Sequence, residues 1–385
     1  MGYAKNALAI FSGLIFTLNV SAQTELDLSA IRLPPGFSIE IWSDEVPNAR
    51  SLALGDNGTV FAATRRDGRV YALLPQGDRN PTVITLAENL TMPNGVAFHE
   101  GDLYVAENHR ILRFADIETS LPEVPEAETV IDTLSTERHH GWRYIDFGPD
   151  GKLYIALGAP CNVCDKDGFG NISRMNADGS EQEIVASGVR NSVGFSWHPD
   201  TGDLWFTDNG RDMLGDDIPP GELNHAPRDG LHFGFPYCHG GDIPDPEFGD
   251  QGNCADFEAP AQKLGPHVAP LGILFYDGDM FPREYQGQAF IAEHGSWNRS
   301  QKTGYRVTLV RMERGRPVAY EVFAEGWLEE EEVSGRPVDL LVLEDGSMLL
   351  SDDQNGVIYR ISYTRPMDEG VALNWIDWED HFPNP

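Results

Sequence analysis

Residues 139–158 read HHGWRYIDFGPDGKLYIALG, and most of this stretch has the form of a β-hairpin. Residues 144–147 are short and β-prone, residues 148–151 (Gly-Pro-Asp-Gly) have the chemistry of a turn, and residues 153–155 resume the strand. The stretch decides the fold because similar units recur along the chain.

The same order of short apolar strand, Asp/Asn/Gly turn and second apolar strand occurs in five further places. Four of the turn glycines are separated by 43, 50 and 51 residues: Gly58, Gly101, Gly151 and Gly202. Residues 272–310 hold a less regular copy, and residues 338–361 hold the last. A repeat of ~40–50 residues built from a few antiparallel strands is typical of β-propellers. We therefore predict an all-β fold, a six-bladed β-propeller. A β-sandwich, the alternative, would not require near-constant spacing.

The chain is strongly acidic, with 28 Lys and Arg against 61 Asp and Glu and a formal net charge of −33. Such a charge repels nucleic acid and anionic lipid, so neither is expected as a partner. The content of 41% hydrophobic and 10% aromatic residues is enough for a globular core. In so acidic a chain, a cluster of arginines is conspicuous.

The four cysteines, Cys161, Cys164, Cys238 and Cys254, are expected to form disulfides in an exported protein. Of the three possible pairings we favour local closure, Cys161 with Cys164 and Cys238 with Cys254. A redox Cys-x-x-Cys is less favoured because no thioredoxin-like βαβ pattern surrounds it. Asp165 rather than histidine follows the motif, which removes the covalent haem interpretation.

The N-terminus has the form of a secretion signal. Lys5 precedes an apolar run over residues 8–16, and Val-Ser-Ala at residues 20–22 fits small-x-small cleavage. The run is short and broken by Ser-Gly at residues 12–13, which disfavours a membrane span, although a retained anchor is the alternative. We expect residues 1–22 to be a signal peptide, the protein to be secreted or periplasmic, and the mature chain not to insert into a membrane.

The rest of the chain is expected to form one domain. We predict a single six-bladed propeller over residues 23–385, with a long loop insertion at residues 224–266. This insertion contains two of the cysteines, and we expect it to cover one rim of the pocket.

Propellers usually carry functional groups on the loops at one face, where the segments leading into the inner strands converge. In this chain those segments hold polar or basic residues in every copy: Arg50, Asn94, His139, His140, Arg190, Asn191, His267, Arg336 and Asp339. Arginines and histidines aimed at one channel imply an anionic ligand. Ordinary loop residues with satisfied hydrogen bonds are the alternative for any single position and a weaker explanation for the set.

Five motifs, in a fixed order, carry a resemblance to a known family. They are His-x₇-Gly-Pro-Asp-Gly-Lys-Leu-Tyr from His140, Gly-Val-Arg-Asn-x-x-Gly at 188–194, Thr-Asp-Asn-Gly-Arg-Asp at 207–212, Val-Ala-Pro at 268–270, and Glu-His-Gly-Ser-Trp-Asn-Arg at 293–299. On these motifs the chain resembles the soluble quinoprotein (aldose) sugar dehydrogenases, especially their sorbosone dehydrogenase-like branch. These are six-bladed propellers that use pyrroloquinoline quinone (PQQ) and calcium. The resemblance covers essentially the whole mature chain.

The chemistry of PQQ suits the residue types. PQQ carries three carboxylates and an electrophilic quinone carbonyl, so its pocket should be rich in arginine and include a metal. The resemblance implies that His140, eight residues before the Gly of Gly-Pro-Asp, is the general base. It also implies that Arg190 and Asn191 contact the quinone oxygens, with Arg190 stabilising the charge that develops. His139 would contact the substrate where better-known sugar dehydrogenases have an acidic residue, which indicates a substrate other than simple glucose.

The resemblance further implies a calcium ion held by the backbone carbonyls of Gly210 and Arg211 together with the cofactor. Asp339 is expected on the substrate side, where it would orient nearby groups. The remaining cofactor contacts that the resemblance implies are Arg50, Asn94, His267, His294, Trp297, Arg299 and Arg336, the last paired with a PQQ carboxylate.

Two acidic clusters have a simpler interpretation. Asp212, Asp216 and Asp217 could hold a second, structural calcium, but an exposed acidic loop is the favoured reading. The run Glu329–Glu332 is most simply a solvated loop.

We therefore predict a PQQ- and calcium-dependent oxidoreductase that oxidises a sugar by hydride transfer to the quinone. The substrate would be an aldose, a sorbosone-like keto-aldehyde or a polyol, and a separate cytochrome or quinone would accept the electrons. One alternative is a calcium-dependent lactonase-type propeller, which needs carboxylate and amide ligands in the channel. A non-catalytic binding propeller is the other, and His140, Arg190, Asn191 and Arg336 argue against it.

Overall fold

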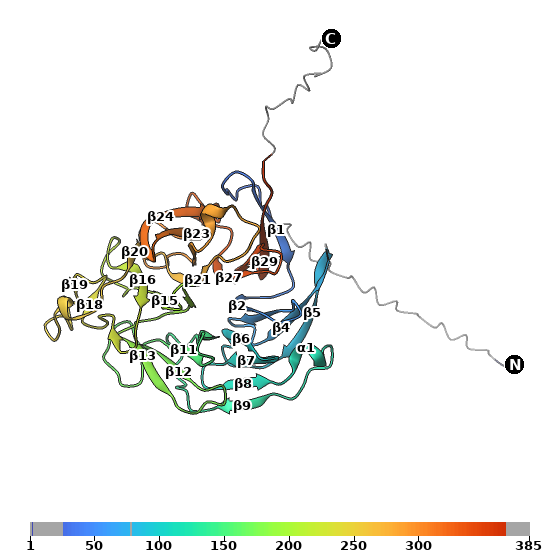
Figure 1. The fold of residues 1–385 in the computed structure, drawn as a ribbon, viewed down its shortest axis with the longest axis horizontal. Helices are drawn as coiled ribbons and strands as arrows, with labels where there is room; N and C mark the ends of the chain where they lie inside the picture. The colour runs from blue at the N-terminus through green and yellow to red at the C-terminus, as the bar shows by residue number, and fades with distance from the viewer. Residues whose placement is uncertain (1, 3–25, 78, 367–385) are drawn as a thin grey trace, which may run out of the picture.

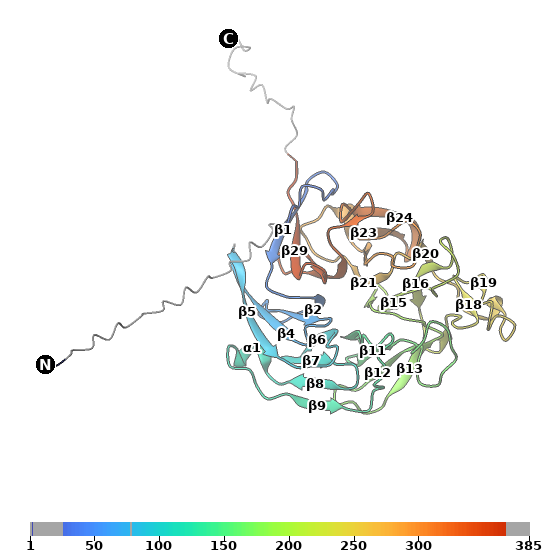
Figure 2. The same cartoon turned by 180° about the vertical axis from the view of Figure 1, so that it is seen from behind.

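The computed structural model describes residues 2, 26–77 and 79–366, and its β-strands form six sheets arranged as a ring (Figures 1 and 2). The predicted six-bladed β-propeller is confirmed. The predicted signal peptide lies, apart from Gly2, outside the described residues. No helix in the described part of the chain is long and apolar enough to cross a membrane.

Each blade contains four antiparallel strands in regular order from the inside of the ring to the outside. The inner strands are β2 (Ala49–Leu54), β6 (Gly95–His99), β10 (Ile145–Phe147), β14 (Phe195–Trp197), β21 (Pro270–Phe275) and β27 (Pro337–Val342). The second strands are β3 (Val60–Thr64), β7 (Asp102–Ala106), β11 (Leu153–Leu157), β15 (Leu204–Asp208), β22 (Ala289–Glu293) and β28 (Met348–Asp352). The third strands are β4 (Val70–Gln76), β8 (Ile111–Phe114), β12 (Asn171–Met175), β16 (Pro220–Ala226), β23 (Arg306–Glu313) and β29 (Val357–Tyr363). The outer strands are β5 (Arg79–Ala87), β9 (Glu128–Ile131), β13 (Glu183–Ser187), β20 (Gln262–Pro266), β24 (Arg316–Ala324) and β1 (Phe37–Ser43).

The ring is closed by strands from opposite ends of the sequence. The outer strand of the last blade, β1, pairs antiparallel with β29, from Phe37 opposite Tyr363 to Ser43 opposite Ile358. Figure 1 shows these two strands, one blue and one red, side by side. The sixth sheet therefore forms only when both segments are present.

The core is divided among the interfaces between neighbouring blades. One hydrophobic cluster fills each of the six interfaces: Tyr154 and Phe206 meet between the third and fourth blades, for example, and Phe290 and Tyr359 share the cluster between the fifth and sixth. The second strands β3, β22 and β28 are buried at every residue because a blade lies on each side of them. This packing explains why these strands are apolar or small without alternation until their C-terminal ends, where β22 has Glu293 and β28 has Asp352.

The predicted hairpin of residues 144–155 is present as β10 and β11, with Ile145 opposite Ile155 and Phe147 opposite Leu153. Its turn holds Gly151 in the left-handed region at φ +72, where a side chain would be strained. The hairpin forms the two inner strands of the third blade. The residues just before β10 therefore lie close to the ring axis, at the end of the blade where its innermost strand begins.

The long connection between β16 and β20, residues 227–261, contains small elements outside the blades. They are β17 (Leu231–His232), which extends the third sheet beside β13, the pair β18 (Cys238–His239) and β19 (Ile243–Pro244), and the 3₁₀ turn η1 (Cys254–Asp256). Other short elements are α1 (Ile117–Ser120) between β8 and β9 of the second blade and the 3₁₀ turn η2 (Arg283–Tyr285) between β21 and β22 of the fifth. The pair β25 (Leu328–Glu329) and β26 (Glu332–Val333) lies in the connection between the fifth and sixth blades.

Both predicted disulfides are confirmed. Cys161 is bonded to Cys164 in the loop after β11, and Cys238 is bonded to Cys254 within the insertion. Each bridge closes a short loop on the same side of the propeller as the residues described next.

Candidate active site

A cavity of about 470 Å³ lies where the segments that lead into the inner strands converge. Eleven of the predicted site residues lie in its wall: Arg50, His139, His140, Arg190, Asn191, Gly210, Arg211, His267, His294, Trp297 and Arg336. Part of the wall is apolar, because Val193 and Leu271 line the cavity and pack with Val338 in a small hydrophobic cluster. The fold therefore brings most of the predicted set to one place.

His140 is held in one orientation in front of the β10–β11 hairpin. Its Nδ1 lies 2.7 Å from the carbonyl oxygen of Ala159, which can only accept, so Nδ1 carries the proton and Nε2 carries the lone pair. Burial, followed by the positive charge of Arg190, lowers the pKa of His140 well below its ordinary value. His140 therefore presents a neutral imidazole with a basic Nε2, as a general base requires.

The backbone around His140 is built for this position. His140 has a φ of +49, in the left-handed region that a residue with a side chain seldom occupies. Gly158 faces it, and a Cβ there would lie 2.7 Å from the His140 Cβ and 2.9 Å from Asn191 Oδ1. Strained backbone at such a point is typical of functional sites, and the contacts explain why residue 158 is a glycine.

Arg190 and Asn191 are anchored through their backbone by one carboxylate. The N–H of Arg190 donates to Asp208 Oδ2 at 2.7 Å, and the N–H of Asn191 donates to Asp208 Oδ1 at 2.6 Å. Burial, followed by the charge of Glu222, raises the pKa of Asp208 to about 8. The Arg190 side chain forms a 3.0 Å ion pair with Asp212. The backbone of Arg190 and Asn191 is thus fixed by Asp208 at both N–H groups, which sets the direction of the two side chains.

An ion-pair centre at Asp353 was missed by reasoning from the sequence. Its Oδ2 accepts hydrogen bonds from Arg50 and Arg65, both at 3.1 Å, and its Oδ1 accepts one from His294 Nε2 at 2.8 Å. His294 Nδ1 in turn accepts a hydrogen bond from the Arg336 guanidinium at 3.0 Å. One carboxylate therefore orders four basic side chains on one side of the cavity.

The charges in this network set the protonation of its members. Burial lowers the pKa of His294 to about 4 even though Asp353 opposes the shift, so this imidazole is neutral at pH 7. Burial alone would raise the pKa of Asp353, but the interaction with His294 and the charges of Arg50 and Arg65 hold it far below its ordinary value. Arg50 and Arg65 share one carboxylate, and Arg336 is held by the neutral His294, so the network carries net positive charge beside the cavity.

A positional rule accounts for the missed residues and also for His294, which the motif had implied. Arg65 follows β3, Asn209 follows β15, His294 follows β22 and Asp353 follows β28. Because the second strand of a blade runs antiparallel to the inner strand, its C-terminal end lies beside the start of the inner strand. Residues that follow the second strands therefore reach the same site as residues that precede the inner strands. Both kinds of position can be located in the sequence once the strands of each repeat are assigned.

Gly210 and Arg211 lie in a loop that is tied to the long insertion. The Arg211 guanidinium donates to the carboxylates of Asp245 and Glu247. The backbone of both residues remains beside the cavity, and no hydrogen bond among the described residues is accepted by either carbonyl oxygen. Backbone carbonyl oxygens are hard, neutral donors of a kind that calcium accepts as ligands.

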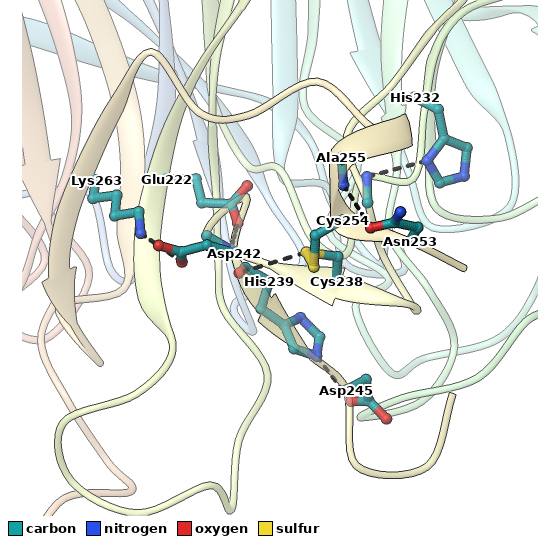
Figure 3. Close-up of a disulfide and its surroundings, with 12 residues drawn as sticks. Glu222, His232, Cys238, His239, Asp242, Asp245, Asn253, Cys254, Ala255 and Lys263 are labelled. Carbon is teal, nitrogen blue, oxygen red and sulfur yellow. Dashed lines mark hydrogen bonds and ion pairs between the residues drawn. A yellow bond between two sulfur atoms is a disulfide. The ribbon is translucent and has the colours of Figure 1, made fainter. Parts of the chain in front are cut away.

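The insertion itself is stabilised around the second disulfide (Figure 3). His239 adjoins Cys238 and directs its Nε2 at Asp245, 2.8 Å from Oδ2, so the carboxylate that holds Arg211 is also held by this histidine. Lys263 pairs with Asp242 at 2.6 Å across the same region. The disulfide-closed insertion thus contacts the cavity wall through Arg211.

Three predicted site residues do not line the cavity. The side chain of Asn94 accepts from Arg50 Nε at 2.8 Å and donates to the Arg143 carbonyl oxygen, so Asn94 lies behind Arg50. Asp339 accepts from the N–H groups of Leu52 and Leu340, and burial raises its pKa to about 7. Its contacts link two inner strands.

Arg299 also lies outside the cavity wall. Its guanidinium donates to the Asp216 carbonyl oxygen at 3.2 Å and pairs with Asp217 at 3.6 Å. Asp212 pairs with Arg190, so each of the three aspartates considered for a second calcium, and interpreted instead as an acidic loop, has an arginine nearby. No group of three or more His, Cys, Asp or Glu in the described part of the chain is arranged to hold a metal ion.

The rim of the cavity carries an exposed aromatic residue. Trp297 is 69% exposed while lining the cavity, so its indole faces solvent at the mouth. His267, another lining residue, donates from Nε2 to the Gly215 carbonyl oxygen at 2.7 Å, which fixes the ring. An exposed tryptophan beside an open polar cavity is a common platform for a sugar ring.

The comparisons with known proteins agree with this architecture. The model of the family described as "TrAA12-like" matches residues 31–364. The chain belongs to the TrAA12-like family. The family resemblance predicted from the five motifs is thereby confirmed. A protein of Borreliella burgdorferi described as uncharacterized is 33% identical over 371 residues, which cover 91% of this chain and 95% of that protein.

Solved structures share the fold of this TrAA12-like protein at low sequence identity. The calcium structure of a Trichoderma reesei enzyme of carbohydrate-active family AA12 has a TM-score of 0.77 at 19% identity, covering 87% of this chain and 97% of that one. The holo form of the PQQ domain of pyranose dehydrogenase from Coprinopsis cinerea has a TM-score of 0.75 at 17% identity, covering 86% and 97%. The PQQ-bound aldose sugar dehydrogenase of Streptomyces coelicolor has a TM-score of 0.63 at 18% identity, covering 86% and 100%.

The cavity of the TrAA12-like protein fits an anionic cofactor such as PQQ. Six arginines line it against a single carboxylate among the described residues, that of Asp212. Four buried polar atoms in its lining residues have no hydrogen-bond partner in the described part of the chain: Arg65 Nε, Arg211 Nε, Arg336 Nε and Asn191 Oδ1. Buried polar groups are nearly always paired, and the three guanidinium donors match carboxylate acceptors.

Proposed function

We propose that this protein is a PQQ- and calcium-dependent sugar dehydrogenase that passes electrons to a separate cytochrome or quinone acceptor. The observation that carries the proposal is the neutral His140 imidazole, whose basic Nε2 lies in an arginine-lined cavity. The substrate would be an aldose, a sorbosone-like keto-aldehyde or a polyol. The predicted signal peptide, residues 1–22, fits this proposal because the protein would then be secreted or periplasmic.

The proposal assigns a separate role to each residue of the site. PQQ, when bound, supplies an electrophilic carbonyl that accepts hydride, and calcium polarises it. His140 Nε2 takes the proton from the substrate hydroxyl, and Ala159 stabilises the imidazolium that results because its carbonyl holds Nδ1–H. Arg190 supplies positive charge next to the base. His139 and Trp297 hold the sugar at the open side of the cavity.

The anion-binding wall is assigned to Arg50, Arg65 and Arg336, ordered through Asp353 and His294. Calcium is assigned to the carbonyl oxygens of Gly210 and Arg211, with the cofactor completing its ligands. The lactonase alternative needs several side-chain carboxylates in the channel. The one carboxylate of the described lining residues, Asp212, already pairs with Arg190, which favours the dehydrogenase.

A direct experiment tests the proposal. The mature chain, residues 23–385, is stripped of metal with a chelator, and PQQ is titrated with and without Ca²⁺ while quinone absorbance and tryptophan fluorescence are recorded. We expect calcium-dependent stoichiometric binding, followed by dye-linked oxidation of sugars that differ at C1 and C2. Absence of PQQ binding in the presence of Ca²⁺ would contradict the proposal. Binding without oxidation of any sugar would contradict the assigned substrate class.

A further inference from the structure

The short loop closed by Cys161 and Cys164 contains a residue, Asn162, that accepts two hydrogen bonds from Arg190. Asn162 lies between the two cysteines, and its carbonyl oxygen accepts a hydrogen bond from Arg190 Nε at 2.8 Å. Its side-chain Oδ1 accepts a second one from Arg190 Nη2, also at 2.8 Å. A single residue therefore accepts two of the N–H groups of a guanidinium that is almost completely buried.

The same amide reaches the loop that carries Gly210 and Arg211. Asn162 Oδ1 accepts from the backbone N–H of Asp212 at 2.9 Å, and Asn162 Nδ2 donates to the Asp212 carbonyl oxygen at 3.0 Å. The Asn162 side-chain amide therefore binds both the N–H and the C=O of one residue, as a neighbouring strand does. Asn162 thus fixes Arg190 and the 210–212 loop relative to each other.

The start of the same loop holds His140. The carbonyl oxygen of Ala159 accepts from His140 Nδ1 at 2.7 Å, and the N–H of Ala159 donates to the Arg190 carbonyl oxygen at 2.8 Å. Residues 159–162 therefore touch the base, the arginine and the 210–212 loop within four positions. The disulfide shortens the path that this loop can take, and so restricts its conformations.

We infer that Asn162, held in the Cys161–Cys164 loop, is a positioning residue that sets the place of Arg190 beside His140 and the 210–212 loop. The catalytic importance of Asn162 rests on the proposed function. The hydrogen bonds that Asn162 makes to Arg190 and Asp212 do not depend on that function. Arg190 has other partners, Asn209 O at 3.1 Å and Asp212 Oδ2 at 3.0 Å. Both lie on the 208–212 segment, so without Asn162 the guanidinium is held from one side and loses its link to the loop of His140.

A test without cofactor separates this inference from the proposed function. In the cofactor-free protein the titration of His140 is followed by NMR, with its imidazole signals assigned by comparison with His140→Ala. Arg190 lowers the pKa of His140, so Asn162→Ala should raise the midpoint by roughly half a pH unit because the guanidinium is no longer fixed nearby. Asn176→Ala, in the β12–β13 turn, serves as the control.

The disulfide gives a second arm. Cys161→Ser together with Cys164→Ser should move the His140 midpoint in the same direction as Asn162→Ala, with the melting temperature checked for each variant. A His140 midpoint that is unchanged in folded Asn162→Ala and in the double-serine variant would overturn the inference, whether or not PQQ binds. When PQQ binds, Asn162→Ala should lower kcat about 10-fold or more with a smaller change in KM. Equal loss in the Asn176→Ala control would also count against it.

Discussion

Arg336 Nη2 and His294 Nδ1 lie 3.0 Å apart, so a permanently charged guanidinium is held by a neutral acceptor. The proton of His294 is on Nε2, where Asp353 accepts it. In the described part of the chain no carboxylate lies within ion-pair distance of Arg336. Its charge is therefore available to an anion in the cavity.

Replacing Arg336 by Ala should weaken PQQ binding about 10- to 100-fold, because one charge-assisted hydrogen bond to a carboxylate is lost. Arg299→Ala is the matched control, since Arg299 belongs to the same set of predicted contacts but lies outside the cavity wall, where it donates to the Asp216 carbonyl oxygen and pairs with the Asp217 carboxylate. The measurement is the dissociation constant from fluorescence titration in excess Ca²⁺. Equal effects of the two substitutions would show that Arg336 does not contact the cofactor.

His140→Ala should reduce turnover by about 10²–10⁴-fold, the usual contribution of a general base. PQQ affinity should change little, because the imidazole makes its structural hydrogen bond to Ala159 rather than to a cofactor-binding side chain. His225→Ala, outside the cavity and paired with Asp203, is the control for loss of a histidine elsewhere. If His140→Ala retained its turnover, another residue would have to be the general base.

The acid limb of the pH–rate profile should lie below the ordinary histidine value of about 6.5. Burial and Arg190 lower the pKa of His140, and the base is active only when unprotonated. Activity per bound cofactor should therefore stay constant from above pH 7 down to below pH 6.5, and fall at lower pH. The profile of kcat/KM measures this limb, and a midpoint above 6.5 would contradict the geometry of the site.

The contribution of His294 to the stability of the protein should fall as the pH is lowered from about 6.5 to 4. In this window the unfolded chain protonates His294, whereas in the fold burial holds its pKa at about 4. The free energy of unfolding should therefore lose up to about 1.4 kcal/mol per pH unit for this one proton. Below about pH 4 the low pKa of Asp353 adds to the loss as the unfolded chain protonates that carboxylate too.

Denaturant titration at several pH values measures this slope. His294→Gln removes the titrating group and should reduce the slope between pH 6.5 and 4 by about one proton. His139→Gln, at an exposed position with a smaller shift, should leave the slope almost unchanged. The same slope in wild type and His294→Gln would mean that His294 titrates equally in both states.

The fold was predictable because its information is local and repeated. Each blade displays the same turn chemistry, as at Gly58, Gly101 and Gly151, and the strands between them need only short-range pairing. The pairing of β1 with β29 was not foreseen, since the Ile39–Ile361 contact joins residues with no local signal for each other. Long-range closure of this kind follows from the ring and not from the segment itself.

The candidate site was predictable where the motif and the position before an inner strand coincide, as for His140 and Arg190. Asp353 and Arg65 were missed because they follow second strands, and a Ser-Asp-Asp segment reads as an ordinary loop end. Asn162 was missed because its importance lies in two contacts with Asp212 and two with Arg190, which only the folded chain brings together. Arg299 belongs to the same motif as Trp297, but its guanidinium contacts Asp216 and Asp217 instead of the cavity.

The pairing of β1 with β29 also governs the order in which the chain can be completed during synthesis. Five sheets can form as the ribosome releases them, but β1, made first, has no partner until β29 emerges last. During that interval the edge of β1 stays open to pairing with other chains. A polypeptide that crosses a membrane unfolded and is released whole avoids this interval, because both edges become available at the same moment.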